Sequence, residues 1–239
     1  IPLRLVGSEM CIRDRHLAVW AAVAANKLGR PIKLRLDRDE DFMVTGKRHP
    51  FAYEYDVGFD DTGRITGLKL QMAANCGFSA DLSGPVADRA VFHADNAYYL
   101  SDVEIASYRC KTNTQSHTAF RGFGGPQGVI VIEAILGDIA RALGRDAQDV
   151  RLANLYGKDA STGRHVTHYQ MAVEDNILHE LLPTLEQTSH YRQRQAEIAD
   201  WNAHNTVIKR GMAITPVKFG ISFTAVSYTH LTLPTKRIV

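Results

Sequence analysis

The residues best suited to chemistry lie in one glycine-rich stretch, TAFRGFGGPQG, at residues 118–128. Its glycines permit a left-handed backbone and let another group approach the main chain closely. Pro126 suits the first turn of a helix, where backbone N–H groups favour an anionic or oxo ligand. Arg121 adds a permanent cation with several hydrogen-bond donors. The stretch therefore fits either a turn into a buried helix or the wall of a site for a bound cofactor.

Two nucleotide-binding patterns do not fit this stretch. The dinucleotide fingerprint requires glycines spaced G-x-G-x-x-G, whereas GFGGPQG at residues 122–128 gives G-x-G-x-x-x-G. A phosphate-binding loop needs a lysine and a serine or threonine after its last glycine, and Val129 stands there instead. The glycine spacing therefore argues against a nicotinamide-binding domain.

Composition narrows the class of partner. The chain has 239 residues and a formal net charge of +2, which gives no reason to expect nucleic acid or an anionic membrane as partner. No apolar run approaches the roughly 20 residues that a membrane span needs. The three cysteines, Cys11, Cys76 and Cys110, form neither a disulfide framework nor a zinc or iron–sulfur pattern. We therefore expect a cytoplasmic protein without nucleic-acid or membrane partners.

Hydrophobic periodicity predicts an α+β fold. Strands that pair through hairpins and helices that come in blocks are typical of that class. A DDTG turn at residues 60–63 joins two of the strands, and a charged loop is expected at residues 38–50. The expected helices are 16–29, 85–93, 126–144, 146–156, 173–182 and 191–204, and the expected strands are 32–37, 51–59, 64–72, 103–110 and 212–224.

The two ends of the chain differ in origin from its middle. EMCIRD at residues 9–14 and VSYTHL at residues 226–231 can be encoded by opposite strands of one DNA element. The longer segments LVGSEMCIRDR and VSYTHLTLPT resemble translated sequencing adaptors. Such segments are excluded from reasoning about the fold. We therefore expect adaptor-derived tails at residues 1–15 and 226–239 around a partial domain at residues 16–225.

An ordered series of motifs carries a family resemblance. TAFRGFGGPQG, with LDRDEDFMVTGKRHPF, DRAVFHADNAY, RCKTNT and KFGISFT, resembles the molybdenum-binding subunit of the xanthine dehydrogenase/aldehyde oxidase family over residues 16–225. The resemblance implies part of a domain that binds a molybdenum–molybdopterin cofactor. It also implies oxidation of purines, hypoxanthine and xanthine to urate, with water as oxygen source. Electrons would leave through 2Fe–2S clusters and FAD to NAD, all bound by parts outside this chain.

The same resemblance assigns roles to the substrate-facing residues. Arg89, in DRAVFHADNAY, matches an arginine that stabilises charge developing on the purine. A fixed guanidinium aimed at growing negative charge suits that role. Phe123 and Phe223 match two phenylalanines that sandwich the substrate ring, and Thr224 matches a substrate-contacting threonine.

The cofactor-facing residues lie in the glycine-rich stretch. Ala119, Phe120, Arg121 and Gly122 match positions at the cofactor, with the main chain of Arg121 nearest the molybdenum. The family's general base is a glutamate on the C-terminal side of Thr224, so the chain as written is expected to be inactive. The resemblance further implies an FAD/iron–sulfur subunit or domain as partner and a dimer of the catalytic unit.

Two other functions remain open from the sequence. An aldehyde oxidase-type enzyme would share the molybdenum centre, although Arg89 favours the purine-oxidising branch. A non-catalytic interaction module is the second alternative, because the distant base is not part of the sequence. The intact arginines and phenylalanines of the motifs argue against such a module.

Overall fold

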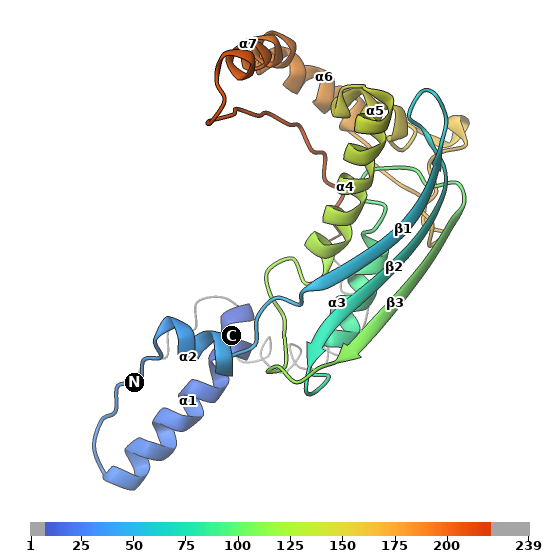
Figure 1. Cartoon of the computed structure of the whole chain (residues 1–239). Coiled ribbons are helices and arrows are strands. Elements are labelled where there is room, and N and C mark those ends of the chain that lie inside the picture. Colours follow the sequence, from blue (N-terminus) through green and yellow to red (C-terminus); the bar gives the residue numbers. More distant parts are fainter. Residues whose placement is uncertain (1–7, 221–239) are drawn as a thin grey trace.

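A three-stranded sheet forms the centre of the molecule. The computed structural model describes residues 8–220, with side chains from residue 16 onward (Figure 1). Strand β1 (Phe51–Phe59) pairs antiparallel with β2 (Ile65–Gly77), and β2 pairs parallel with β3 (Val103–Lys111). The sheet order is β1-β2-β3. Helices together with this mixed sheet make the fold α+β, as the sequence predicts.

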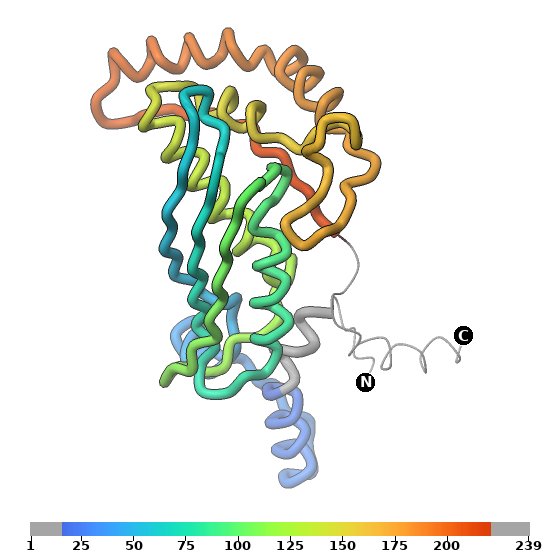
Figure 2. Tube along the Cα trace, turned by 90° about the vertical axis from the view of Figure 1, so that its right-hand side faces the viewer, coloured from blue at the N-terminus to red at the C-terminus, as the bar shows by residue number. Residues whose placement is uncertain are grey.

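The core lies between the sheet and the helices that cover one of its faces. Helices α3 (Ser83–Phe92) and α4 (Gly125–Leu143) pack on the sheet, and α5 (Ala147–Asn154) packs on α4 (Figures 1 and 2). Apolar residues alternate along β2 and recur at helical spacing along α4, so each element turns one apolar side inward. The side chains that meet there include Leu70, Met72, Ile132, Ile135, Leu136 and Ile139.

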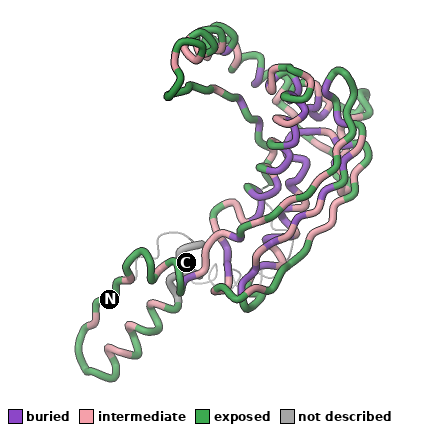
Figure 3. The backbone as a smooth tube through the Cα atoms, viewed as in Figure 1, coloured by how far each residue is buried: buried purple, intermediate pink, exposed green. Residues whose placement is uncertain are grey.

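The remaining helices lie at the two ends of this body. Helices α1 (Ser8–Leu28) and α2 (Arg38–Val44) form an arm at one end, and much of it is exposed (Figures 1 and 3). At the other end α6 (Leu178–Thr188) and α7 (Tyr191–His204) follow a short 3₁₀ helix, η1 (Ala160–Thr162). An extended segment, residues 205–220, then returns along the helical face toward the C-terminal end of α3 (Figure 2).

Several expected elements are confirmed at nearly their predicted bounds. These are strands β1 and β3 and helices α7 and α4. The expected hairpin of β1 and β2 also forms, but β2 extends to Gly77, beyond its predicted end at residue 72. Pro126 lies in the first turn of α4, and Gly144 ends that helix in the left-handed conformation. Proline at the start and glycine past the end are the strongest of the helix-boundary signals.

Two predictions near the N-terminus are wrong. Residues 32–37 form no strand, and the expected loop at 38–50 contains helix α2. Asp37 begins α2 with a reciprocal capping box, in which its side chain accepts from the Glu40 N–H. Such a box stabilises a short helix. The charged composition of residues 38–44 alone does not predict that helix.

Two further predictions toward the C-terminus need correction. The helix expected at 173–182 begins only at Leu178, whose N–H donates to the Asn176 side chain. The strand expected at 212–224 is not formed by residues 212–220, and residues 221–224 lie outside the described chain. In the described part, Pro216 and Lys218 bond to the Asn96 side chain rather than to a strand.

Candidate functional site

The glycine-rich stretch brings two helices unusually close. Gly124 has a φ of +100°, and a Cβ added there would overlap the carbonyl oxygen of Val86 in α3. A Cβ at Gly128 would overlap the Ala90 carbonyl oxygen and lie 2.8 Å from the His93 carbonyl carbon. At Gly124 and Gly128 the group that approaches the main chain closely is therefore the backbone at α3, not a ligand. These glycines set the packing of α4 on α3.

That packing places Arg89 next to the start of α4. Phe219 joins the two elements, because its ring lies 4.7 Å from the Arg89 guanidinium carbon and 2.5 Å from where a Gly125 Cβ would be. Arg89 also donates to the Gly220 carbonyl and is only 5% exposed. A cation over an aromatic face is a favourable contact. The structure thus covers Arg89 with residues 219 and 220, a contact that the sequence analysis missed although it singled out their motif.

A buried ionic network holds this covering segment in place. Asp95 has no exposed surface and pairs with the Lys218 ammonium. Tyr156 donates its hydroxyl to Asp95 at 2.6 Å, and burial together with that carboxylate raises the pKa of Tyr156. The Lys218 N–H donates to the Asn96 side chain at 3.1 Å. Residues that directly follow α3 therefore fix the segment that lies over Arg89.

Arg48 supports the loop that precedes α4. Its guanidinium lies 4.4 Å from the centre of the Phe120 ring and donates to the Arg121 carbonyl at 2.6 Å. The Thr118 N–H donates to the Lys47 carbonyl at 3.1 Å, so the two segments run side by side. In the sequence, Arg48 is recognisable only as part of a charged loop. Its partners are distant along the chain, so no local pattern reveals the contact.

The predicted cofactor residues all lie in this supported loop. Ala119 is buried, Phe120 and Gly122 are partly buried, and Arg121 is exposed. Phe123 is partly buried in the same loop and has a φ of +48°, which is uncommon for a residue with a side chain. Arg89 comes from α3 instead, and Phe223 and Thr224 lie outside the described residues.

A pair of buried histidines, His49 and His117, adjoins Arg48 and the glycine-rich stretch in the sequence. His49, 2% exposed, has its Nε2 2.8 Å from the Ser83 hydroxyl, and its ring is 5.9 Å from that of His117. Burial, and then the neighbouring His117, lowers the pKa of His49 to about 4. Burial also lowers the pKa of His117. Both rings are therefore neutral at pH 7, and the His49–Ser83 hydrogen bond joins the residues just before β1 to the start of α3.

A family match identifies the domain. Residues 11–155 match the molybdopterin cofactor-binding domain family. The chain belongs to this family. Over 211 residues it is 44% identical to the xanthine dehydrogenase of Drosophila subobscura, a match that covers 88% of the chain and 15% of the relative. Over 212 residues it is 44% identical to the xanthine dehydrogenase/oxidase of Gallus gallus, covering 89% of the chain and 15% of the relative. The chain thus spans about 15% of the length of these relatives.

Solved structures share the fold of this molybdopterin cofactor-binding domain. The aldehyde oxidoreductase of Desulfovibrio desulfuricans superposes with a TM-score of 0.63 at 22% identity, over 79% of the chain and 20% of that protein. The quinoline 2-oxidoreductase of Pseudomonas putida gives 0.62 at 20% identity, over 78% of the chain and 24% of that protein. These likenesses confirm the expected fold.

The loop's donors fit an oxygen-rich ligand such as the family's cofactor. The Phe120 carbonyl accepts from the Phe123 N–H at 2.7 Å, and the Gly122 carbonyl accepts from the Gly125 N–H at 2.9 Å. Within residues 8–220, the N–H groups of Arg121 and Gly122 donate to no acceptor. Adjacent main-chain donors of this kind form a concave site for anionic or oxo groups.

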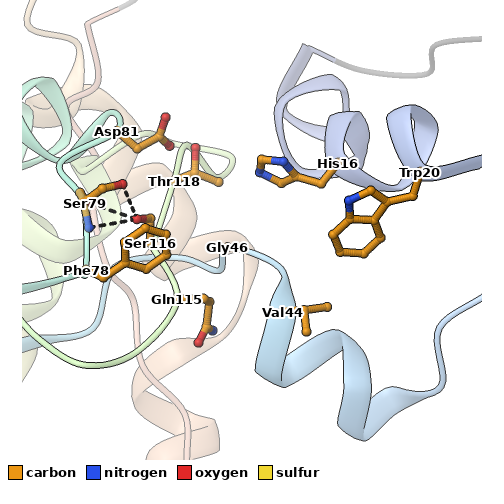
Figure 4. Close-up of a pocket in the computed structure, with 10 residues that line it drawn as sticks. All are labelled: His16, Trp20, Val44, Gly46, Phe78, Ser79, Asp81, Gln115, Ser116 and Thr118. Carbon is orange, nitrogen blue, oxygen red and sulfur yellow. Dashed lines mark hydrogen bonds between the residues drawn. The ribbon is translucent and has the colours of Figure 1, made fainter. Parts of the chain in front are cut away.

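A cavity of about 350 Å³ adjoins the start of this loop (Figure 4). Its wall combines Trp20 of α1 with the polar groups of Ser79, Ser116 and Thr118. Ser79 and Ser116 bond through their hydroxyls at 2.5 Å, as the dashed lines show. The volume falls in the range typical of small-molecule sites.

Among the described residues, no group of three or more histidines, cysteines, aspartates or glutamates could hold a metal ion. Neither is any described helix of this domain long and apolar enough to cross a membrane.

Proposed function

We propose that the chain is part of a molybdenum hydroxylase that oxidises purines, hypoxanthine and xanthine to urate. The observation that carries the proposal is the 119–122 loop, whose two adjacent main-chain donors fit an oxo-bearing cofactor. The names of the relatives at 44% identity support the choice of substrate.

The loop residues hold the cofactor in this proposal. Ala119, Phe120, Arg121 and Gly122 contact the molybdenum–molybdopterin cofactor, and the main chain of Arg121 lies nearest the molybdenum. When bound, the cofactor supplies the two-electron oxidation, with water as the oxygen source. The chain's own task is to hold that group with fixed donors, which require no reorganisation during the reaction.

Arg89 stabilises the negative charge that develops on the purine, while Phe123 and Phe223 stack on its ring and Thr224 contacts it. In the structure Phe219 covers the Arg89 guanidinium at 4.7 Å. Arg89 can therefore meet substrate only after residues 219 and 220 uncover it. The network of Asp95 and Lys218 sets the free energy of that movement, because it fixes the adjoining backbone.

The wider assembly is also part of the proposal. Residues 16–225 are the enzyme-derived part, and the tails 1–15 and 226–239 are adaptor-derived. The matches to the relatives extend over 211 and 212 residues, close to the length of that part. The parent protein is a cytoplasmic dimer whose other segments or subunits carry the 2Fe–2S clusters and FAD and pass electrons to NAD. In this proposal the general base of the parent is a glutamate on the C-terminal side of Thr224.

A full-length parent protein tests the proposal. Purified protein is assayed for molybdenum and pterin, then incubated with xanthine in ¹⁸O-labelled water. The proposal predicts bound molybdenum and urate that carries the label. Protein that binds molybdenum and oxidises only aldehydes would support the aldehyde oxidase-type alternative. Protein without molybdenum would indicate a non-catalytic module.

A further inference from the structure

One peptide unit of the cofactor loop is held from outside the loop. The guanidinium carbon of Arg48 lies over the Phe120 ring, 4.4 Å from its centre, and the guanidinium donates to the Arg121 carbonyl at 2.6 Å. Stacking and hydrogen bonding together fix the guanidinium plane, which a lysine in its place could not do. The carbonyl direction of the Arg121–Gly122 peptide is thereby defined.

The direction of the next N–H follows from peptide geometry. In a trans peptide the C=O and the N–H point to opposite sides of the chain. The peptide between Arg121 and Gly122 is trans. Because Arg48 holds its carbonyl, the Gly122 N–H points away from Arg48. This N–H donates to no acceptor within residues 8–220, so it is available to a ligand on that side.

Without Arg48 this peptide could readily flip. Rotation of the peptide plane reverses the sign of φ at the following residue, and glycine adopts either sign at little cost. Gly122 has a φ of +89°. The neighbouring carbonyls, of Phe120 and Gly122, already accept hydrogen bonds within the loop. The Arg121 carbonyl is the one in this turn that relies on a distant side chain.

The segment around Arg48 is placed for this contact. A Cβ added at Gly46 would lie 2.6 Å from the Ser116 carbonyl oxygen, so glycine lets the two segments meet. Lys47, the adjacent cation, points elsewhere and pairs with Asp41 at 2.8 Å. Arg48 and Lys47 are neighbouring cations with separate partners, so a change at Lys47 is a matched control for a change at Arg48.

We propose that Arg48 is a positioning residue that aims the Gly122 N–H at the oxygen ligands of the molybdenum cofactor. The inference rests on the proposed function, because it requires the cofactor to lie at this loop. It assigns to Arg48 no contact with the substrate. Its effect passes through the main chain of the loop.

The test uses the full-length holoenzyme with Arg48→Met, Arg48→Lys and the control Lys47→Met. Molybdenum content, the paramagnetic resonance spectrum of the partly reduced metal, kcat and KM are measured. Arg48→Met should change that spectrum and lower kcat by about tenfold, the smaller end of the range for residues that orient a ligand, with KM within twofold. Arg48→Lys retains a donor and should recover part of the loss, whereas Lys47→Met should match the wild type.

The outcomes separate this inference from the proposed function. Wild-type protein that binds no molybdenum would overturn the proposed function, and the inference with it. Wild-type protein that loads molybdenum, together with an Arg48→Met variant of unchanged spectrum and kcat, would overturn the inference alone. If Arg48→Met fails to accumulate, Arg48→Lys decides, since a wild-type spectrum and kcat there would contradict the need for the planar stack on Phe120.

Discussion

At the scale of single residues, the glycines of the TAFRGFGGPQG stretch serve different neighbours. Gly124 and Gly128 accommodate the backbone of α3, whereas Gly122 allows an unusual turn in the proposed cofactor loop. The sequence showed that close approach was possible there, but it could not show which group approaches. Only packing distinguishes a helix from a ligand at such a position.

Gly128→Ala should therefore destabilise the protein by about 2 kcal/mol, because overpacking against rigid backbone forces α3 and α4 apart. Gly137→Ala in the same helix is the control, since its Cβ would meet only the Arg141 side chain at 3.6 Å. That change should stabilise by about 0.5–1 kcal/mol. Urea unfolding of both variants measures the difference. A neutral Gly128→Ala would contradict the tight helix contact.

His49 should make stability fall on acidification. Its folded pKa is about 4, below the ordinary value of 6.5, so protons bind the unfolded chain more tightly. The stabilisation that comes from burying neutral His49 is complete above pH 6.5 and is lost as the pH falls toward 4. Between pH 7 and pH 5 the loss from this residue is about 2 kcal/mol. The variant His49→Gln should lack that part of the pH dependence, while the exposed His204→Gln should retain it. Equal dependence in all three proteins would contradict the account.

At the scale of elements, the local sequence pattern predicts those helices and strands whose bounds depend on neighbouring residues. The alternating residues of β1, the Pro126 start and the Gly144 end of α4 all follow from neighbours in the sequence. The alternating pattern of residues 32–37 wrongly predicted a strand, because a strand also needs a neighbouring backbone to pair with. Leu34 in this segment is 42% exposed. The contact of Phe219 with Arg89 could not be predicted from local pattern either, since the two residues lie far apart in the chain.

Lys218→Met tests how the covering segment is held. The change leaves the fully buried Asp95 without its cation and should destabilise the protein by about 3 kcal/mol. Hydrogen exchange at the backbone amides of residues 217–220 should rise, and adding Asp95→Asn should recover part of the stability. Lys69→Met is the control, because its exposed pair with Glu104 at 4.0 Å contributes little. Unchanged exchange in Lys218→Met would contradict this role of the network.

At the scale of the whole molecule, the fold gathers the proposed site from segments far apart in sequence. Arg48 precedes β1, Arg89 lies on α3, and the 119–122 loop leads into α4. Phe219 belongs to the segment 205–220, which returns along the helical face (Figure 2). The family resemblance predicted the loop and Arg89, but not the residues that support and cover them. Those contacts depend on how the helices pack, which single motifs do not encode.

Arg89→Met in the full-length protein tests the central claim most directly, that Arg89 serves purine oxidation. The control Arg109→Met removes a guanidinium of β3 that pairs with Asp88, the residue before Arg89. Loss of a fixed charge aimed at the transition state should lower kcat/KM for xanthine by about 100-fold, and that for an aldehyde by less than about threefold. Arg109→Met should leave both values near those of the wild type. Equal losses for xanthine and aldehyde in Arg89→Met would contradict the account.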